Sequence, residues 1–296
     1  AGNKKQEIKS IKYKTTNLDN NKKKSLNLLL VACYLLLVMF LFYILFTNQT
    51  TKSIISPWQI IPNYFFIIYG LATAVLAFII SRINNTPTSY KLQATSLIIL
   101  HYFLSFSIVL IIYKIGYGFD SFIHQATVDL INKTGSVDPK PFYYLGQYAL
   151  VVILHKITAI PLVWLDKLLV PLLAAIYLPI TLWRVFKKLF TDNKSSLLLI
   201  LTVLILPFSF LIATTPQNFA YLLLLLVILL GLICANIYDL IIIYVLALTA
   251  VVFQPIAGIP AIMFALLLTV YHSDAKTRRG ASLRKCFYLL IFIISS

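Results

Sequence analysis

Charge is scarce in this sequence, and acidic charge is scarcer still. Only 11% of the 296 residues are charged, and nine acidic residues stand against 25 lysines and arginines. The sequence has no glycine-rich phosphate loop, no zinc-ligand spacing and no Ser/His/Asp set. Its three cysteines form neither a disulfide framework nor a metal-binding spacing. These absences exclude the P-loop NTPases, the zinc enzymes and the disulfide-stabilised secreted domains.

Apolar residues fill the chain instead. The sequence is 60% hydrophobic, with a mean hydropathy of +0.90. Repeated solid apolar runs of about 20 residues are long enough to cross the hydrocarbon core of a bilayer. A transmembrane β-barrel would show alternating rather than solid runs. We therefore expect an all-α, polytopic helical membrane protein with about eight to ten apolar segments.

The apolar segments divide the chain into two expected regions. Residues 1–25 form a basic cytoplasmic tail with little hydrophobic pattern, expected to be disordered or to lie on the membrane surface. Residues 26–296 form a transmembrane helical domain, expected to be truncated at its C-terminus. Its spans are expected at 26–46, 62–80, 92–113, 143–160, 162–183, 196–213, 219–235, 240–253 and 259–271.

Lysine and arginine predict the orientation of these spans. They gather in the N-terminal tail and in the stretches 82–91, 184–194 and 272–285. Because cytoplasmic segments carry an excess of Lys and Arg, all of these stretches are placed inside. The net charge of +16 then reflects membrane topology rather than nucleic-acid binding. The arrangement requires 143–183 to cross only once, with a break near Pro161; two full spans there would leave the later basic stretches outside.

The stretch 114–148 is the longest non-terminal part of the chain that is too polar for a bilayer core. Its hydrophobic spacing predicts a helix over 119–133 that lies on the membrane surface. One stripe of this helix consists of Phe119, Ile123, Ala126 and Leu130. Asp120, His124 and Thr127 form the adjacent row, since residues three and four apart are neighbours on a helix. An acid and an imidazole would thus lie together at the membrane–water boundary.

Two interpretations of these polar residues stay open. Asp120 and His124 can act as a general base with its partner, or as two ligands of a divalent cation. Alternatively, Asp120 merely caps the start of the helix. Lys140 can bind a phosphate as a point charge, although its Asp-Pro-Lys-Pro context is more typical of a turn before an aromatic belt.

Several short motifs together resemble a known class of enzyme. They are GFDSFIH at 118–124, TGSV at 134–137, YYLGQY at 143–148, LPF at 206–208 with PQN at 216–218, and FQPIAG at 253–258. The order of acid, amphipathic helix, small-residue turn and aromatic return to the membrane is similar to that of the GT-C class of membrane glycosyltransferases. The resemblance covers residues 95–271.

The resemblance implies a function and a set of site residues. GT-C enzymes transfer a sugar from a polyprenyl-phosphate carrier to an acceptor at the outer face of the membrane, so a lipid-linked donor and the bilayer are the expected partners. Asp120 would be the catalytic base or a metal-associated carboxylate, assisted by His124. The other residues expected to bind substrate are Lys140, Tyr144, Gln147, Gln217 and Gln254. The cofactor is left open, with Mg²⁺ or Mn²⁺ as one option.

Two functions of other classes compete with this interpretation. A transporter or flippase would place ionisable residues at the bilayer midplane of broken helices, whereas the acids were expected to lie in loops. A non-enzymatic membrane assembly protein contradicts nothing in the sequence. A prokaryotic plasma membrane is the expected location; the sugar, the acceptor and the oligomeric state stay open.

Overall fold

The computed structural model of the protein describes residues 2–82, 88–117, 119–137, 144–190, 192–206 and 209–277. Ten α-helices account for most of these residues, and the same residues contain no β-strand beyond one isolated bridge. The helices are α1 (Gly2–Thr47), α2 (Tyr64–Ser81), α3 (Thr88–Ile112), α4 (Phe119–Thr134), α5 (Leu145–Thr158), α6 (Leu162–Leu189), α7 (Asn193–Val203), α8 (Pro216–Ile233), α9 (Ile237–Phe253) and α10 (Pro255–Thr277). Two short 3₁₀ helices, η1 (Pro57–Gln59) and η3 (Ser209–Leu211), lie in connections.

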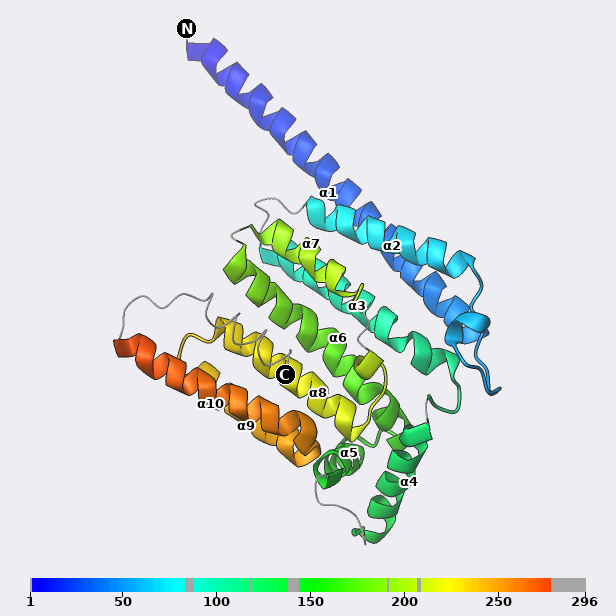
Figure 1. Ribbon diagram of the computed structural model, residues 1–296. Coiled ribbons are helices and arrows are strands. Elements are labelled where there is room, and N and C mark those ends of the chain that lie inside the picture. The colour runs from blue at the N-terminus through cyan, green and yellow to red at the C-terminus, as the bar shows by residue number, and fades with distance from the viewer. Residues whose placement is uncertain are drawn as a thin grey trace.

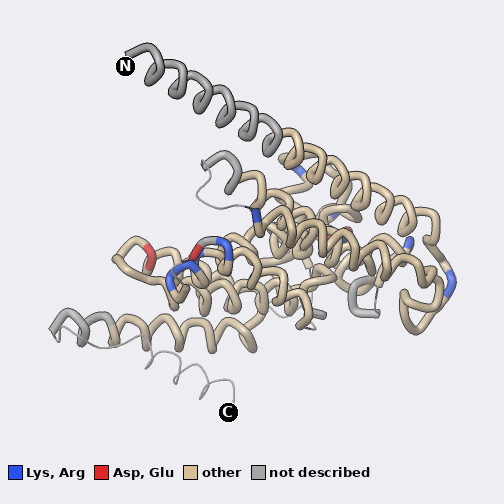
Figure 2. Tube along the Cα trace, turned by 90° about the horizontal axis from the view of Figure 1, so that it is seen from above, with Lys and Arg blue, Asp and Glu red and all other residues tan. Residues whose placement is uncertain are grey.

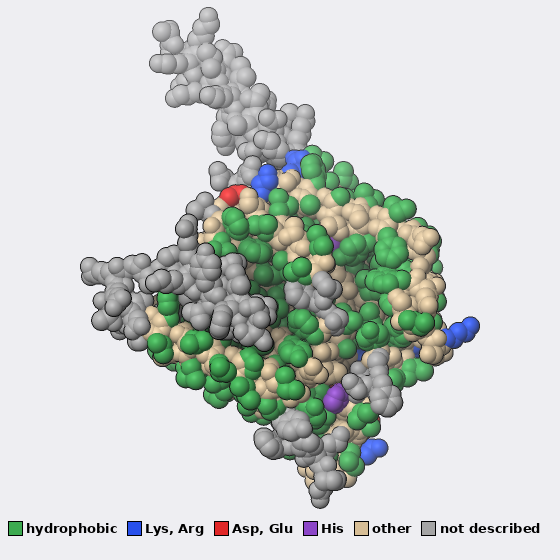
Figure 3. Space-filling view, in the orientation of Figure 1, with side chains coloured by type: hydrophobic (Ala, Val, Ile, Leu, Met, Phe, Trp, Pro, Cys, Tyr) green, Lys and Arg blue, Asp and Glu red, His purple; other side chains and the backbone are tan. Residues whose placement is uncertain are grey.

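Within the described ranges, five helices are long and apolar enough to cross a membrane: α2, α6, α8 and the segments Ser25–Thr47 of α1 and Leu92–Ile112 of α3. Hydrophobic side chains also cover most of the described surface seen in Figure 3. Many large apolar side chains on the outside of the bundle, such as Leu36 and Val245, are more than half exposed. Apolar surface of this extent is what lipid-facing helices present. The protein is a multi-pass, all-α membrane protein.

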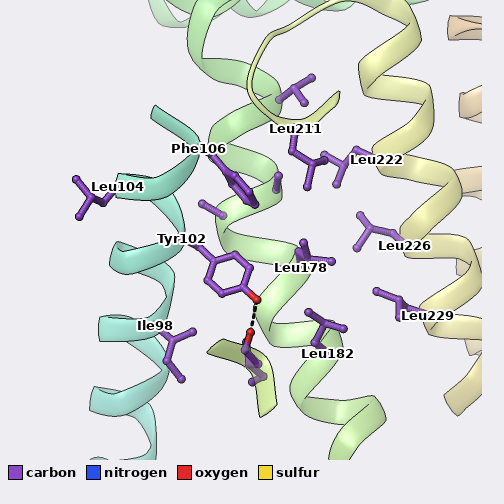
Figure 4. Packing of buried hydrophobic residues seen from close by; sticks show 14 of the residues in the cluster. Ile98, Tyr102, Leu104, Phe106, Leu178, Leu182, Leu211, Leu222, Leu226 and Leu229 are labelled. Atoms are coloured by element: carbon purple, nitrogen blue, oxygen red, sulfur yellow. Dashed lines mark hydrogen bonds between the residues drawn. The ribbon is translucent and has the colours of Figure 1, made fainter. Parts of the chain in front are cut away.

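The long helices lie side by side, from α1 and α2 at one edge to α9 and α10 at the other (Figure 1). Helix α6 is central, because it packs against α3 and α7 on one side and against α8 on the other. A fully buried tyrosine joins two of these helices: Tyr102 of α3 donates a hydrogen bond of 2.6 Å to the carbonyl oxygen of Ile200 in α7. Leu178 of α6 lies beside this bond, and leucines of α8 face it from the other side (Figure 4).

Charged residues lie mostly toward the ends of the helices (Figure 2). Lys187 and Lys188 end α6, Arg82 caps α2, and Asp239 lies in the first turn of α9. The connections that follow α2, α6 and α8 lie toward the same end of the bundle, and the α4–α5 region lies at the opposite end (Figure 1). This distribution agrees with the orientation expected from the basic stretches, in which the α4–α5 end faces outward.

The lengths of two helices agree with the predicted single crossing between residues 143 and 183. Helix α5 has 14 residues and α6 has 28. At 1.5 Å per residue these are about 21 Å and about 42 Å, so only α6 spans a hydrocarbon core of about 30 Å. The break also lies where it was predicted, because Ala159 caps α5 in a left-handed conformation (φ 58°) and Pro161 precedes α6.

Two predictions about the fold are wrong. The basic tail, expected to be disordered or to lie on the membrane surface, is not disordered but helical from Gly2, in one helix with the first span. No proline interrupts it, and its lysines tolerate a helix well. The expected span over 196–213 is not one continuous helix. Helix α7 ends at Val203 and a turn follows, because a proline at 207 disfavours helical backbone in the residue before it.

Candidate functional site at the outer end of the bundle

Helix α4 begins at Phe119 as predicted and ends at Thr134, one residue beyond the predicted end. Gly135, with φ at 73°, supplies the left-handed residue that commonly ends a helix. Thr127 and Val128 are buried against the protein, whereas Ile123 and Leu130 of the apolar stripe are 44% and 45% exposed. The His124 row therefore faces the bundle, and the apolar stripe faces outward, as expected of a helix on a membrane surface.

A short hydrogen bond joins α4 to α5. His124 Nδ1 lies 2.6 Å from the hydroxyl oxygen of Tyr148, which is fully buried. The ring of Tyr144, one helical turn earlier, meets the His124 ring edge-on with centroids 5.9 Å apart. Burial raises the pKa of the Tyr148 phenol, so the hydroxyl stays protonated at neutral pH. His124 is thus held in a fixed aromatic setting in which Tyr144 was expected and Tyr148 was not.

Asp120 lies in the first turn of α4, as the second residue of the helix. An N-cap residue precedes the first helical residue, so the backbone does not favour the interpretation of Asp120 as a cap. The side chain of Asp120 and the whole of Lys140 lie outside the described part of the structure. Their chemical roles therefore stay predictions.

The three glutamines expected at the site occupy different settings. Gln147 of α5 is fully buried, and both atoms of its amide lack a hydrogen-bond partner among the described residues. Gln217 donates a 3.1 Å hydrogen bond to the hydroxyl of Tyr221 on the exposed side of α8. Gln254 follows α9 and is buried. Of these three, Gln147 is the nearest to the site along the chain, since it directly precedes Tyr148, the partner of His124.

The sequence interpretation missed an acid inside a span. Asp166 is the fifth residue of α6 and is only 6% exposed. Its Oδ1 atom has no hydrogen-bond partner among the described residues. An acid within an apolar run is a functional candidate by default, so the segment Trp164-Leu165-Asp166-Lys167 carried a usable signal. The expectation that the acids lie only in loops is wrong for this residue.

Asp166 lines a small pocket at the α4–α5 end of the bundle. The pocket holds about 20 Å³, enough for about one water-sized group. Phe122 and Gln125 of α4 line it together with the segment that follows α3 and with Thr214. Lys167 lines it too, while its ammonium donates a 2.7 Å hydrogen bond to the carbonyl oxygen of Lys114. The lining of this small pocket therefore contains both hydrogen-bond acceptors and hydrogen-bond donors.

A much larger apolar cavity of about 480 Å³ lies next to this pocket. Its lining consists mainly of Trp58, Phe106, Ile108, Leu204, Leu206 and Ile212. Tyr117 lines both the cavity and the polar pocket. Backbone hydrogen bonds hold this region, since Thr50 N donates to Ile112 O (2.9 Å) and Lys114 N donates to Thr50 O (3.1 Å). A large space without charged lining residues and a small space lined by an acid and a lysine thus share one wall.

No family model, curated protein or solved structure matches this chain. Its function must be argued from the geometry of the site itself. Among the described residues no three His, Cys, Asp or Glu side chains gather into a metal-binding group. A divalent cation at Asp120 therefore stays a prediction.

Proposed function

We propose that this protein is a membrane glycosyltransferase that moves a sugar from a polyprenyl-phosphate carrier to an acceptor. The observation that carries the proposal is the shared wall at Tyr117, where a large cavity without charged lining residues meets a small pocket lined by Asp166 and Lys167. A lipid-linked sugar has the same two-part chemistry, with a long apolar chain and a polar head. The chain suits the apolar cavity, and the head suits the space between the 113–117 segment and α4.

The proposed reaction needs a base, a leaving group and a boundary between water and lipid. The acceptor hydroxyl oxygen attacks the anomeric carbon, the bond from that carbon to the phosphate oxygen breaks, and polyprenyl phosphate leaves. The hydroxyl proton passes to the Asp120 carboxylate. His124 lies one turn further along the same helix and is fixed by Tyr148. Lys140 is the proposed cation for the leaving phosphate, because charge develops there as the bond breaks.

The same proposal includes the location of the protein. The N-terminus and the basic ends of α2 and α6 face the cytoplasm, and α4 faces outward, in a prokaryotic plasma membrane. The excess of Lys and Arg at one end of the bundle supports this orientation. The sugar is then transferred on the extracytoplasmic face, where a lipid-borne donor can meet a soluble or a lipid-borne acceptor.

Release of polyprenyl phosphate tests the proposal. The full chain is reconstituted in liposomes with polyprenyl-phosphate hexoses and pentoses and a mixture of acceptors, and the freed carrier is measured by mass spectrometry. We expect release by the wild type and a loss of about a hundredfold or more in Asp120→Asn, because an amide accepts no proton. Asp129→Asn, which removes an acid from the same helix, should keep most of the rate. No release from any donor, or full activity of Asp120→Asn, contradicts the proposed mechanism.

A transporter is the second candidate, because His101 lies near the middle of α3 and is fully buried. Its Nε2 atom lies 3.0 Å from the hydroxyl of Thr73, an arrangement that also suits a neutral hydrogen-bonding residue of the core. Asp166 lies near the start of α6 rather than at its centre, so the acid is not at the midplane where transporters bind their substrates. Transport predicts movement of an intact solute, whereas transfer predicts free polyprenyl phosphate.

A further inference from the structure

The side chain of Asp166 is buried with one carboxyl oxygen unpaired among the described residues. Only 6% of the residue is exposed, and Oδ1 has no hydrogen-bond partner there. The ammonium of Lys167, the neighbour in sequence, donates instead to the Lys114 carbonyl oxygen. A buried carboxylate without a partner destabilises a fold. A ligand that donates a hydrogen bond to this oxygen would remove the cost.

The other groups of the pocket limit the chemistry of that ligand. Lys167 brings a positive charge into the pocket that Asp166 lines, and this charge opposes the binding of a metal cation. The carboxyl oxygens of Asp166 are hydrogen-bond acceptors and suit a phosphate poorly, because the phosphate oxygens are acceptors too. Gln125 adds an amide that can both donate and accept. A neutral group that both donates and accepts hydrogen bonds, such as a hydroxyl, suits this lining best.

The size and position of the pocket narrow the ligand further. A space of about 20 Å³ takes a hydroxyl group but not a whole sugar ring. Helix α4 forms one side of the pocket through Phe122 and Gln125, which follow Asp120 within two turns of the helix. Phe122 packs closely on Gly116, since its Cζ atom lies 3.1 Å from the position that a Cβ atom on Gly116 would take. The ring would therefore lie outside the pocket, near the start of α4.

We propose that this pocket receives one hydroxyl group of the transferred sugar and that Asp166 accepts a hydrogen bond from it. Asp166 is then a specificity-determining residue for the donor sugar. The inference rests on the proposed function and adds to it the part of the substrate that the pocket recognises. A site built to bind a hydroxyl strongly rejects the analogue that lacks it, because its buried polar groups are then left unpaired.

A panel of deoxy sugars tests the inference. Short-chain polyprenyl-phosphate hexoses, each lacking one ring hydroxyl, are assayed with the full-length wild type, Asp166→Asn, Asp166→Ala and Asp129→Asn. We expect kcat/KM of both Asp166 variants to fall about tenfold to a hundredfold for the parent sugar, the range for a hydrogen bond to a charged group. For one deoxy sugar, the Asp166 variants and the wild type should differ by less than about threefold. Asp129→Asn should keep most of the rate for every sugar of the panel, because Asp129 does not line the pocket.

The possible outcomes separate this inference from the proposed function. Equal losses for every deoxy sugar would show that Asp166 acts on the fold alone and would overturn the inference. If the Asp166 variants do not fold, Gln125→Leu replaces them and must show the same selectivity for one hydroxyl. Binding of the same panel to the wild type is measured by calorimetry, so a protein that binds but does not transfer contradicts only the proposed function. If the wild type binds every deoxy sugar as tightly as the parent sugar, the pocket does not recognise a sugar hydroxyl and the inference is wrong.

Discussion

His124 of α4 and Tyr148 of α5 share a hydrogen bond of 2.6 Å between Nδ1 and the phenol oxygen. Tyr148 is fully buried, and Val128 of α4 is buried in the same small apolar cluster as Tyr148 and Val151. The helix that carries Asp120 is therefore attached to the bundle by both polar and apolar contacts. Helix α5 in turn packs on α6 and α9, so the position of the candidate base depends on these helices.

Tyr148→Phe should loosen α4 without unpacking α5. The substitution keeps the buried ring and removes only the hydroxyl, so we expect a loss of about 1 kcal/mol in stability and a lower transfer rate. Hydrogen exchange measured over residues 119–134 should become faster, because α4 loses the hydrogen bond between His124 and the Tyr148 hydroxyl. Tyr221→Phe removes an exposed hydrogen bond from Gln217 and is the matched control. It should change neither the stability nor the hydrogen exchange of α4. Unchanged exchange in α4 would show that the His124 bond does not hold this helix.

Filling the apolar cavity should affect long lipid carriers more than short ones. Ile108 of α3 lines this cavity and is 8% exposed, so Ile108→Trp would place a bulky ring within it. We expect the KM for long-chain polyprenyl-phosphate sugars to rise about tenfold, whereas the KM for donors with one or two isoprene units should change little. Leu248→Trp, at a 54% exposed position of α9, is the control. Equal effects on both chain lengths would argue against a chain in this cavity.

The parts of the fold that follow from local pattern were predictable from the sequence. The bounds of α4, its exposed apolar stripe and the break near Pro161 all reflect spacing, charge or backbone rules that act within a few residues. The division into apolar spans follows in the same way from run length. The end of α7 at Val203 was equally local, since the proline at 207 was visible, but the apolar composition of 196–213 concealed it.

The missing parts of the site depend on contacts between distant segments. Tyr148 becomes part of the site only when α5 packs against α4, because its hydrogen-bond partner His124 belongs to α4. The pocket around Asp166 needs α4, α6 and Thr214 to meet, and no spacing within one segment encodes this. Asp166 was visible in the sequence as an acid within an apolar run. It was missed because a single acid changes the hydropathy of a span-length apolar run only slightly.

Gly258→Ala should destabilise the hairpin of α9 and α10. A Cβ atom at Gly258 would lie 2.3 Å from the Cα atom of Val251, and backbone cannot move aside as a side chain can. We expect a cost of at least about 1–3 kcal/mol, the usual range for overpacking, seen as a lower Tm in detergent. Gly70→Ala is the control, since a Cβ there meets nothing within 4 Å and alanine favours a helix. Equal Tm values for the two variants would contradict the close approach.

Cysteine labelling should place the two ends of the bundle on opposite sides of the membrane. Cys33, Cys234 and Cys286 are first replaced by alanine, and Ser136→Cys or Ala235→Cys is then introduced at an exposed position. Ser136 follows α4, and Ala235 lies between α8 and α9. A membrane-impermeant maleimide added to intact cells should label Ser136→Cys and not Ala235→Cys if, as proposed, the basic ends of α2 and α6 face the cytoplasm. Labelling after the membrane is permeabilised should reach both cysteines and so controls for access.

Labelling of Ala235→Cys alone in intact cells would reverse the orientation and place Asp120 in the cytoplasm. Labelling of both would contradict the arrangement in which α6 alone crosses between α5 and α7, and with it the outer site.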